Sequence, residues 1–119
     1  MKKIISFIIR TYNEEELITR CLEAVYNQNS KYPFEVIIVD SGSTDNTLDT
    51  YSTYPIKIYE IKPEDFTWGY SLNYGFERAK GEYVVCLSAH ALPLSDKWLE
   101  LLISSFSDDT VAAAMCNTL

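Results

Sequence analysis

The sequence predicts an α/β protein with a Rossmann-like, doubly wound and mostly parallel sheet. Continuous apolar runs rich in β-branched residues occur at 4–9 and 34–39, as is typical of strands buried on both faces. Segments with apolar residues at the helical period separate these runs. Each connection is long enough to cross from one parallel strand to the next, which places helices on both faces of the sheet.

The first strand is expected at Ile4–Ile9 and is followed by a helix. Asn13, with Glu16 three residues later, resembles a capping box, and the neighbouring acidic residues favour the positive end of a helix dipole. We therefore expect this helix to begin at Asn13. Its apolar stripe consists of Leu17, Ile18, Cys21, Leu22, Val25 and Tyr26.

The second strand is expected at Phe34–Val39 and ends at Asp40. The turn and cap residues 41–45 then lead into a short helix that runs to about Tyr51. A third strand at Ile56–Ile61 alternates apolar and polar residues, which is typical of an edge strand.

Residues 62–69 are expected to form a loop before the next helix. That helix ends before Gly81, a residue type that suits a helix stop. A fourth buried strand is expected at Tyr83–Leu87, an amphipathic helix at 95–106 and the start of a fifth strand at 111–116. The apolar residues of the helix before Gly81 are Leu72, Phe76 and Ala79.

The chain has 119 residues, a length that suits one domain, taken here as residues 1–119. Its net charge of −7 argues against nucleic acid as a partner, because binding to a phosphate backbone needs clustered Lys and Arg. The sequence has no apolar run of the ~20 residues that a membrane span needs. We expect a cytoplasmic protein whose Cys21, Cys86 and Cys116 are buried, reduced thiols.

Polar residues follow the predicted strands at 10–13, 40–43 and 88–90, and the carboxyl ends of parallel strands meet at one edge of a sheet. Tyr12 offers a ring on which a base could stack, an interaction worth ~1–3 kcal/mol. Asp40 offers acceptors for a ring N–H or a ribose hydroxyl. Alternatively, Tyr12 packs on the first helix and Asp40 caps the second. The pattern alone indicates a pocket and no particular reaction.

Three segments carry a resemblance to a known family: IISFIIRTYNEEELITRCLEAVYNQ, FEVIIVDSGSTDNT and GYSLNYGFERAKGEYVVCL. From about Ile4 to Phe106 the chain resembles the nucleotide-sugar-binding half of a family 2 glycosyltransferase. The resemblance implies the A-type, nucleotide-diphospho-sugar transferase fold, here incomplete at the C-terminus. It also implies inverting transfer of a sugar from a nucleotide-diphosphate sugar to an acceptor hydroxyl, in bacterial polysaccharide or glycan assembly.

The resemblance also implies roles for single positions. Thr11 and Tyr12 match the family's base-contacting segment, with Tyr12 at the stacking position, and Glu14 matches an acidic position beside the nucleotide. Asp40 matches the aspartate that hydrogen-bonds the base. Asn73 matches the asparagine of an Arg-Asn-x-Gly segment.

Two departures from the family pattern concern the diphosphate. Leu72 stands where the family has arginine, which leaves Arg10 as the nearest basic candidate unless it is a solvated strand-end charge. Ser88, Ala89 and His90 stand where an Asp-x-Asp motif usually holds a divalent cation. His90 is a candidate metal ligand, although a lone histidine is more often structural. Without the carboxylates Mg²⁺ should bind weakly, so Mn²⁺ or Mg²⁺ use is doubtful and a mechanism with little metal stays open.

The Ser-Ala-His variant resembles a rhamnosyltransferase-like subgroup of the family. The general base that deprotonates the acceptor is expected beyond residue 119, so this chain reads as a donor-binding part that is inactive alone. The implied partners are a nucleotide-diphospho-sugar donor and a glycan or lipid-linked acceptor, in the cytoplasm or at the inner face of the membrane. The alternative is a non-catalytic nucleotide-sugar-binding module. No G-x-G-x-x-G follows the first strand, which excludes a dinucleotide-binding domain.

Overall fold

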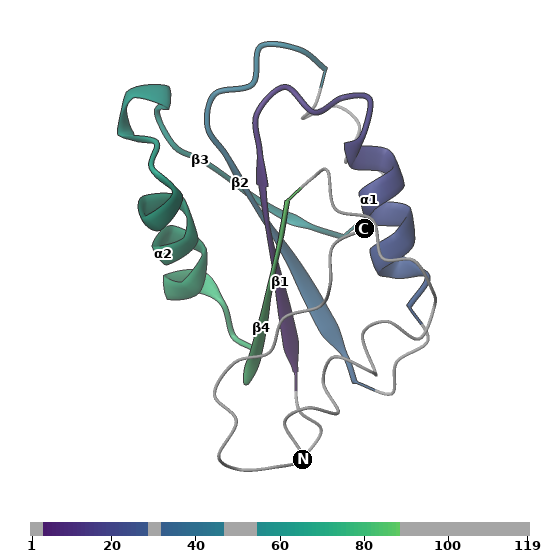
Figure 1. Cartoon of the computed structure of the whole chain (residues 1–119). Coiled ribbons are helices and arrows are strands. Elements are labelled where there is room, and N and C mark those ends of the chain that lie inside the picture. Colours follow the sequence, from purple (N-terminus) through teal and green to yellow (C-terminus); the bar gives the residue numbers. More distant parts are fainter. Residues whose placement is uncertain (1–3, 29–31, 47–54, 89–119) are drawn as a thin grey trace.

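The computed structural model describes residues 4–28, 32–46 and 55–88. Within them, four parallel strands form one sheet in the order β3-β2-β1-β4 (Figure 1). The predicted parallel sheet, with the third strand at an edge, is therefore confirmed. The strands are β1 (Ile5–Thr11), β2 (Phe34–Asp40), β3 (Lys57–Glu60) and β4 (Tyr83–Ser88).

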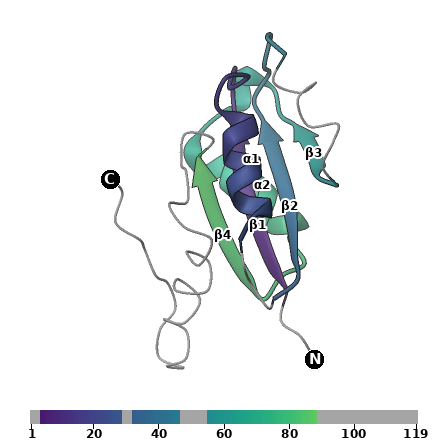
Figure 2. The same ribbon diagram turned by 90° about the vertical axis from the view of Figure 1, so that its right-hand side faces the viewer.

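The helices α1 (Ile18–Tyr26) and α2 (Trp68–Arg78) cover opposite faces of the sheet (Figures 1 and 2). Successive β1 side chains point to opposite faces, so β1 contributes to both cores and is buried throughout 5–9. The core on the α1 face contains Ile5, Phe7, Ile9, Ile18, Cys21, Leu22, Val25, Val36, Ile38, Val85 and Leu87. The smaller core on the α2 face contains Ile8, Ile37, Val39 and Ile61, with Tyr59, Tyr74 and Ala79 packed against it.

The strand register brings the candidate residues to one end of the sheet. Thr11 is paired with Asp40 across β1 and β2, and Arg10 is paired with Ser88 across β1 and β4. The polar ends of the three strands therefore lie side by side, as the sequence predicts.

The start of α1 differs from the expectation. The helix begins at Ile18 rather than at Asn13, and its N-cap residue Leu17 makes no side-chain capping bond. Asn13 has a φ of 51°, and its Oδ1 accepts hydrogen bonds from the backbone N–H of Thr44 at 2.7 Å and of Asp45 at 3.3 Å. The predicted capping box does not form, because the Asn13 side chain instead forms hydrogen bonds that connect its own loop to the loop at Thr44 and Asp45.

The region around α2 also differs from the expectation. The 3₁₀ helix η2 (Pro63–Asp65) interrupts the predicted loop, and α2 begins at Trp68, where Thr67 Oγ1 accepts from the Tyr70 N–H at 2.9 Å. Gly81 does not stop this helix, which ends at Arg78. A Cβ at Gly81 would lie 2.7 Å from Ile4 O and from Ser6 N, so a glycine is needed there for close approach to β1.

β4 is buried on one face only, contrary to the expectation of a fully buried strand. Val84 is 39% exposed and Cys86 is exposed, so the prediction of a buried thiol is wrong for Cys86 and correct for Cys21. Cys116, the short helix to Tyr51 and the elements expected at 95–106 and 111–116 lie outside the described residues. None of the described helices is long and apolar enough to cross a membrane.

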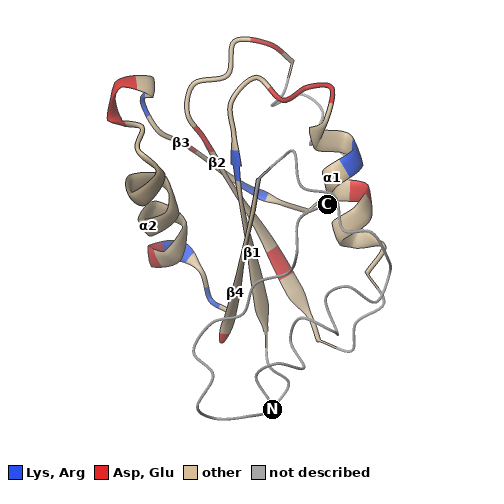
Figure 3. Cartoon of the chain, in the orientation of Figure 1, with Lys and Arg blue, Asp and Glu red and all other residues tan. Residues whose placement is uncertain are grey.

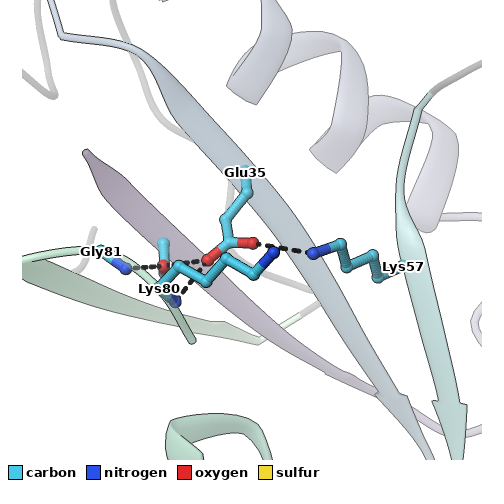
Figure 4. A network of polar contacts seen from close by, with 5 residues as sticks. Glu35, Lys57, Lys80 and Gly81 are labelled. Carbon is cyan, nitrogen blue, oxygen red and sulfur yellow. Dashed lines mark hydrogen bonds and ion pairs between the residues drawn. The ribbon is translucent and has the colours of Figure 1, made fainter. Parts of the chain in front are cut away.

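A polar network centred on Glu35 of β2 connects the strands near the amino-terminal ends of β1 and β2 (Figure 4). Its Oε2 accepts from Ser6 Oγ at 2.5 Å and from the Lys80 backbone N–H at 2.7 Å, and its Oε1 lies 3.5 Å from Lys57 Nζ. Ser6 Oγ in turn accepts from the Gly81 N–H at 2.8 Å. One carboxylate thus links β1, β2, β3 and the turn before β4.

Candidate functional site

A pocket of about 290 Å³ opens at the carboxyl ends of the strands, next to η2 and the start of α2. Within the part of the chain that the structure describes, its wall combines aromatic rings with one basic side chain and one carboxylate. The lining residues are Arg10, Thr11, Tyr12, Glu14, Ser41, Pro63, Phe66 and Trp68.

The floor of this pocket is fixed by a turn that Asp40 organises. Asp40 is fully buried, and its Oδ1 accepts from Thr11 Oγ1 at 2.7 Å and from Ser43 Oγ at 2.5 Å. Its Oδ2 accepts from the backbone N–H groups of Gly42 at 3.0 Å and Ser43 at 2.8 Å. Gly42 has a φ of 95°, and a Cβ there would lie 2.5 Å from Pro63 Cγ. The turn therefore packs tightly under η2 and presents Ser41, rather than Asp40, to the pocket.

The aromatic side of the pocket consists of Tyr12, Phe66 and Trp68. The Phe66 and Trp68 rings contact each other edge to face, with centroids 5.7 Å apart. Tyr12 is 52% exposed, so its ring is not part of the core beneath α1. Flat apolar rings beside polar groups are suited to holding a planar ligand by stacking.

Arg10 is the basic group of the pocket. Its Cζ lies 3.7 Å from the centre of the Trp68 ring, in a cation–π contact. Its Nε and Nη1 are buried and have no hydrogen-bond partner among the described residues. Burial lowers the pKa of Arg10, whereas the nearby Cys86 raises it. Because an arginine keeps its charge far above neutral pH, the site holds a cation with unfilled donors.

The predicted site residues fall into three groups. Those that line the pocket are Arg10, Thr11, Tyr12 and Glu14. Asp40 lies beneath it, Asn73 is exposed on α2 outside the lining, and Ser88 is placed by its backbone beside Arg10. Ala89 and His90 lie outside the described residues. Their expected roles stay predictions.

Sequence reasoning missed the wall formed by Pro63, Phe66 and Trp68, because residues 62–69 were expected to be a plain loop. The pair of aromatic residues on either side of Thr67, a good N-cap residue, was the available signal. A helix that begins at Trp68 carries its first side chain toward the strand ends.

A second cavity of about 320 Å³ lies on the acidic side of the same end of the molecule. Acidic residues are concentrated in the loops there (Figure 3). This cavity is lined by Asn13, Glu14, Glu15, Glu16, Leu17 and Asp45. Among the described residues, no group of three His, Cys, Asp or Glu side chains is placed to hold a metal ion.

Known proteins are similar to this chain in sequence and in fold. The glycosyl transferase family 2 model matches residues 6–119. A dolichyl N-acetyl-glucosaminyl phosphate diacetamido-dideoxy-glucuronosyltransferase of Methanococcus voltae is 39% identical over 77% of this chain and 30% of its own length. The O-antigen chain rhamnosyltransferase WbaN of Salmonella anatum is 32% identical over 91% of this chain and 35% of its own. The chain thus spans about a third of these relatives.

A solved structure has the same architecture. The mannosyltransferase of Pyrobaculum calidifontis, in complex with GDP-mannose and Mn²⁺, superimposes with a TM-score of 0.85 and 31% identity. The match covers 100% of this chain and 36% of that one. The A-type fold and the family expected from the sequence are both confirmed. The chain belongs to glycosyl transferase family 2.

Proposed function

We propose that this chain supplies the donor site of a glycosyltransferase that moves a sugar from a nucleotide-diphosphate sugar to an acceptor hydroxyl with inversion. The observation that carries the proposal is the pocket at the strand ends, in which the exposed ring of Tyr12 and the cation of Arg10 face one cavity. Membership of the family and the GDP-mannose bound to the Pyrobaculum mannosyltransferase support it.

In this proposal the base stacks on Tyr12 and the diphosphate lies toward Arg10. Stacking tolerates any base, so the ring supplies affinity rather than a choice of nucleotide. Glu14 accepts from ribose hydroxyls, because an ionised carboxylate offers acceptors only. Asp40 acts through the turn that it holds, since all the hydrogen bonds described for its carboxylate oxygens come from Thr11 and residues 42–43.

The leaving nucleoside diphosphate carries the charge that develops during transfer. Arg10 is proposed to offset part of it. Ser88, which is paired with Arg10, is proposed to contact the nucleotide sugar together with Ala89 and His90, which lie outside the described residues. Asn73 is proposed to contact the nucleotide sugar from α2. The base that deprotonates the acceptor is expected outside residues 1–119, and the acceptor is proposed to be a glycan or a lipid-linked glycan.

A divalent cation is the family's usual aid to the leaving group, and the Pyrobaculum mannosyltransferase holds Mn²⁺. The described residues of this chain offer no matching cluster of ligands. His90, the candidate ligand, lies outside them.

A second candidate function is nucleotide-sugar binding without catalysis. The replacement of the Asp-x-Asp motif by Ser88, Ala89 and His90 favours it. The two candidates differ downstream of this chain, because only an enzyme needs an acidic base positioned near the acceptor.

Calorimetric titration of the full chain with UDP-, GDP- and dTDP-sugars, with and without Mn²⁺, tests the proposal. We expect at least one of these donors to bind, and Tyr12→Ala to weaken that binding. If His90 is a metal ligand, Mn²⁺ should tighten binding in the parent and not in His90→Ala. Failure of every donor to bind under both conditions would contradict the proposed function.

A further inference from the structure

The contact between Arg10 and Trp68 joins two rigidly held parts of the chain. Arg10 lies within β1, where its backbone is paired with Val39 on one side and Ser88 on the other. Trp68 is the first residue of α2, directly after the N-cap residue Thr67. Ser71 is 1% exposed, and its hydroxyl donates to the backbone oxygens of Thr67 at 3.1 Å and Trp68 at 3.2 Å. The backbone positions of both partners are therefore fixed by hydrogen bonds.

Burial does not explain where the Trp68 ring lies. The side chain is 63% exposed, the most of any large hydrophobic residue described, so little apolar area is removed from water. The contacts described for this ring are an edge-to-face contact with Phe66 and the guanidinium of Arg10, with Cζ 3.7 Å from the ring centre. Among the described residues, the ring is thus held by Phe66 and by the cation that it covers.

A ring stacked on a guanidinium covers its face and leaves the N–H donors at its edge available for hydrogen bonds. The five N–H donors of arginine lie in the guanidinium plane, where they can meet the oxygens of a phosphate. In Arg10 both Nε and Nη1 are buried without an acceptor in the described part of the chain, which is an unfavourable state that a ligand oxygen would relieve.

The local charges favour an anion at this position. Among the described residues that line the pocket, Arg10 is the only cation, and it makes no ion pair with any described carboxylate. The basic residues Lys57 and Arg78 are engaged elsewhere, with Glu35 and with Tyr74 and Glu77. In a chain of net charge −7, an anionic ligand depends on such a local cation.

We propose that Trp68 is a positioning residue that holds the guanidinium of Arg10 toward the diphosphate of the bound nucleotide. The proposal deepens the proposed function and rests on it for the identity of the ligand. In this proposal Trp68 strengthens binding of the diphosphate by holding Arg10. It does not bind the base, which stacks on the ring of Tyr12.

The test measures calorimetric affinities of the full chain for uridine, UDP and inorganic pyrophosphate, with GDP and guanosine used instead if GDP binds better. Arg10→Gln should weaken UDP and pyrophosphate about 10-fold or more, because a charge-assisted hydrogen bond is lost, and leave uridine within about twofold. Trp68→Ala should weaken the same two ligands about 2- to 30-fold, the range expected for a cation–π contact. Trp68→Phe should restore most of that loss.

Two controls and a double variant separate positioning from general damage. Arg20→Gln makes the same charge change on the exposed side of α1, and Phe76→Ala removes an exposed ring of α2 outside the pocket; both should bind UDP as the parent does. The double variant of Arg10→Gln with Trp68→Ala should bind UDP no more weakly than Arg10→Gln alone, because Trp68 acts through Arg10.

The results that would overturn the proposal are distinct from those that would overturn the function. If Trp68→Ala leaves UDP affinity unchanged, weakens uridine as much as UDP, or adds its full effect to Arg10→Gln, Trp68 does not position Arg10. If pyrophosphate binds through Arg10 and Trp68 while no nucleotide is preferred to it, the positioning role stands and the nucleotide function fails. If no anion binds at all, both fail.

Discussion

Thr11 and Asp40 face each other across β1 and β2, and the Thr11 hydroxyl donates a 2.7 Å hydrogen bond to Oδ1 of Asp40. Both side chains are buried, at 3% and 0% exposure. The same carboxylate accepts from the turn at 42–43. This pair therefore connects the end of the central strand to the loop that forms the floor of the pocket.

Removing the Asp40 carboxylate should destabilise the turn at 42–43. In Asp40→Ala, the Thr11 hydroxyl and the backbone N–H groups of Gly42 and Ser43 lose their acceptors, so we expect a loss of about 2–4 kcal/mol in the free energy of unfolding. Urea denaturation measures this loss. Thr11→Val, which removes a single bond, should lose about 1 kcal/mol. A stable Asp40→Ala protein that still binds nucleotide as the parent does would contradict the assigned role.

The ring of Tyr12 should carry a large part of the affinity for a nucleoside. Tyr12→Ala should weaken binding about 10- to 100-fold, which corresponds to the ~1–3 kcal/mol of base stacking, whereas Tyr12→Phe should retain most of it. Isothermal titration with the best-bound nucleoside diphosphate measures the effect. Tyr70→Ala, which removes an exposed ring of α2 outside the pocket lining, is the matched control. Equal affinities of Tyr12→Ala and the control would exclude the stacking role.

Two glycines should respond in opposite ways to the same substitution. Gly81→Ala places a Cβ within 2.7 Å of backbone atoms of Ile4 and Ser6, so we expect destabilisation of about 1–3 kcal/mol. Gly69 lies inside α2, where an added Cβ would have no described neighbour within 4 Å, and Gly69→Ala should stabilise by about 0.5–1 kcal/mol through helix propensity. Thermal unfolding of the two variants checks both signs. Stabilisation by Gly81→Ala would contradict the close approach described for this turn.

Glu35 should make stability depend on pH at the acidic end. Burial alone raises the pKa of its carboxyl, but hydrogen bonds from Ser6 and the Lys80 N–H, with the charge of Lys57, lower the pKa overall. A carboxyl with a lowered pKa stabilises the fold above its unfolded value of about 4.3, and this contribution is lost as pH falls through the folded value.

The variant Glu35→Gln isolates that contribution. It should be less stable than the parent at pH 7, and the difference should shrink as the pH falls below about 4. Urea denaturation at several pH values measures it. Lys57→Met should have a small effect, about 0.5 kcal/mol or less, because the Lys57 side chain is 45% exposed. A difference between Glu35→Gln and the parent that stays constant from pH 7 to pH 3 would contradict this account.

The parts of the fold set by local hydrophobic pattern could be predicted from the sequence. The apolar runs of β1 and β2 specify buried parallel strands, and the register then brings Arg10, Thr11 and Asp40 to one end. The predictions that were wrong concerned residues whose roles depend on contacts between segments distant in the sequence. The side chain of Asn13 accepts hydrogen bonds from Thr44 and Asp45 instead of capping a helix, and no local sequence pattern predicts these bonds.

The candidate site was predicted in part for the same reason. Its strand-end residues follow from topology, whereas the wall at Phe66 and Trp68 depends on where α2 begins and on the contact with Arg10. Gly81 shows the same limit, since its need for a missing Cβ arises from β1, many residues earlier in the chain. Side-chain roles that depend on tertiary packing are the ones that the sequence leaves open.

The most direct test of the central claim is to locate the nucleotide by NMR. Titrating the ¹⁵N-labelled full chain with the best-bound nucleoside diphosphate should shift the amide resonances of residues 10–14, 41–43 and 64–68, which surround the pocket. Amides of the polar network at Glu35 and Gly81, at the other end of the sheet, should stay unchanged. Shifts confined to that lower network, or no shifts at saturating ligand, would contradict the assignment of this pocket as the donor site.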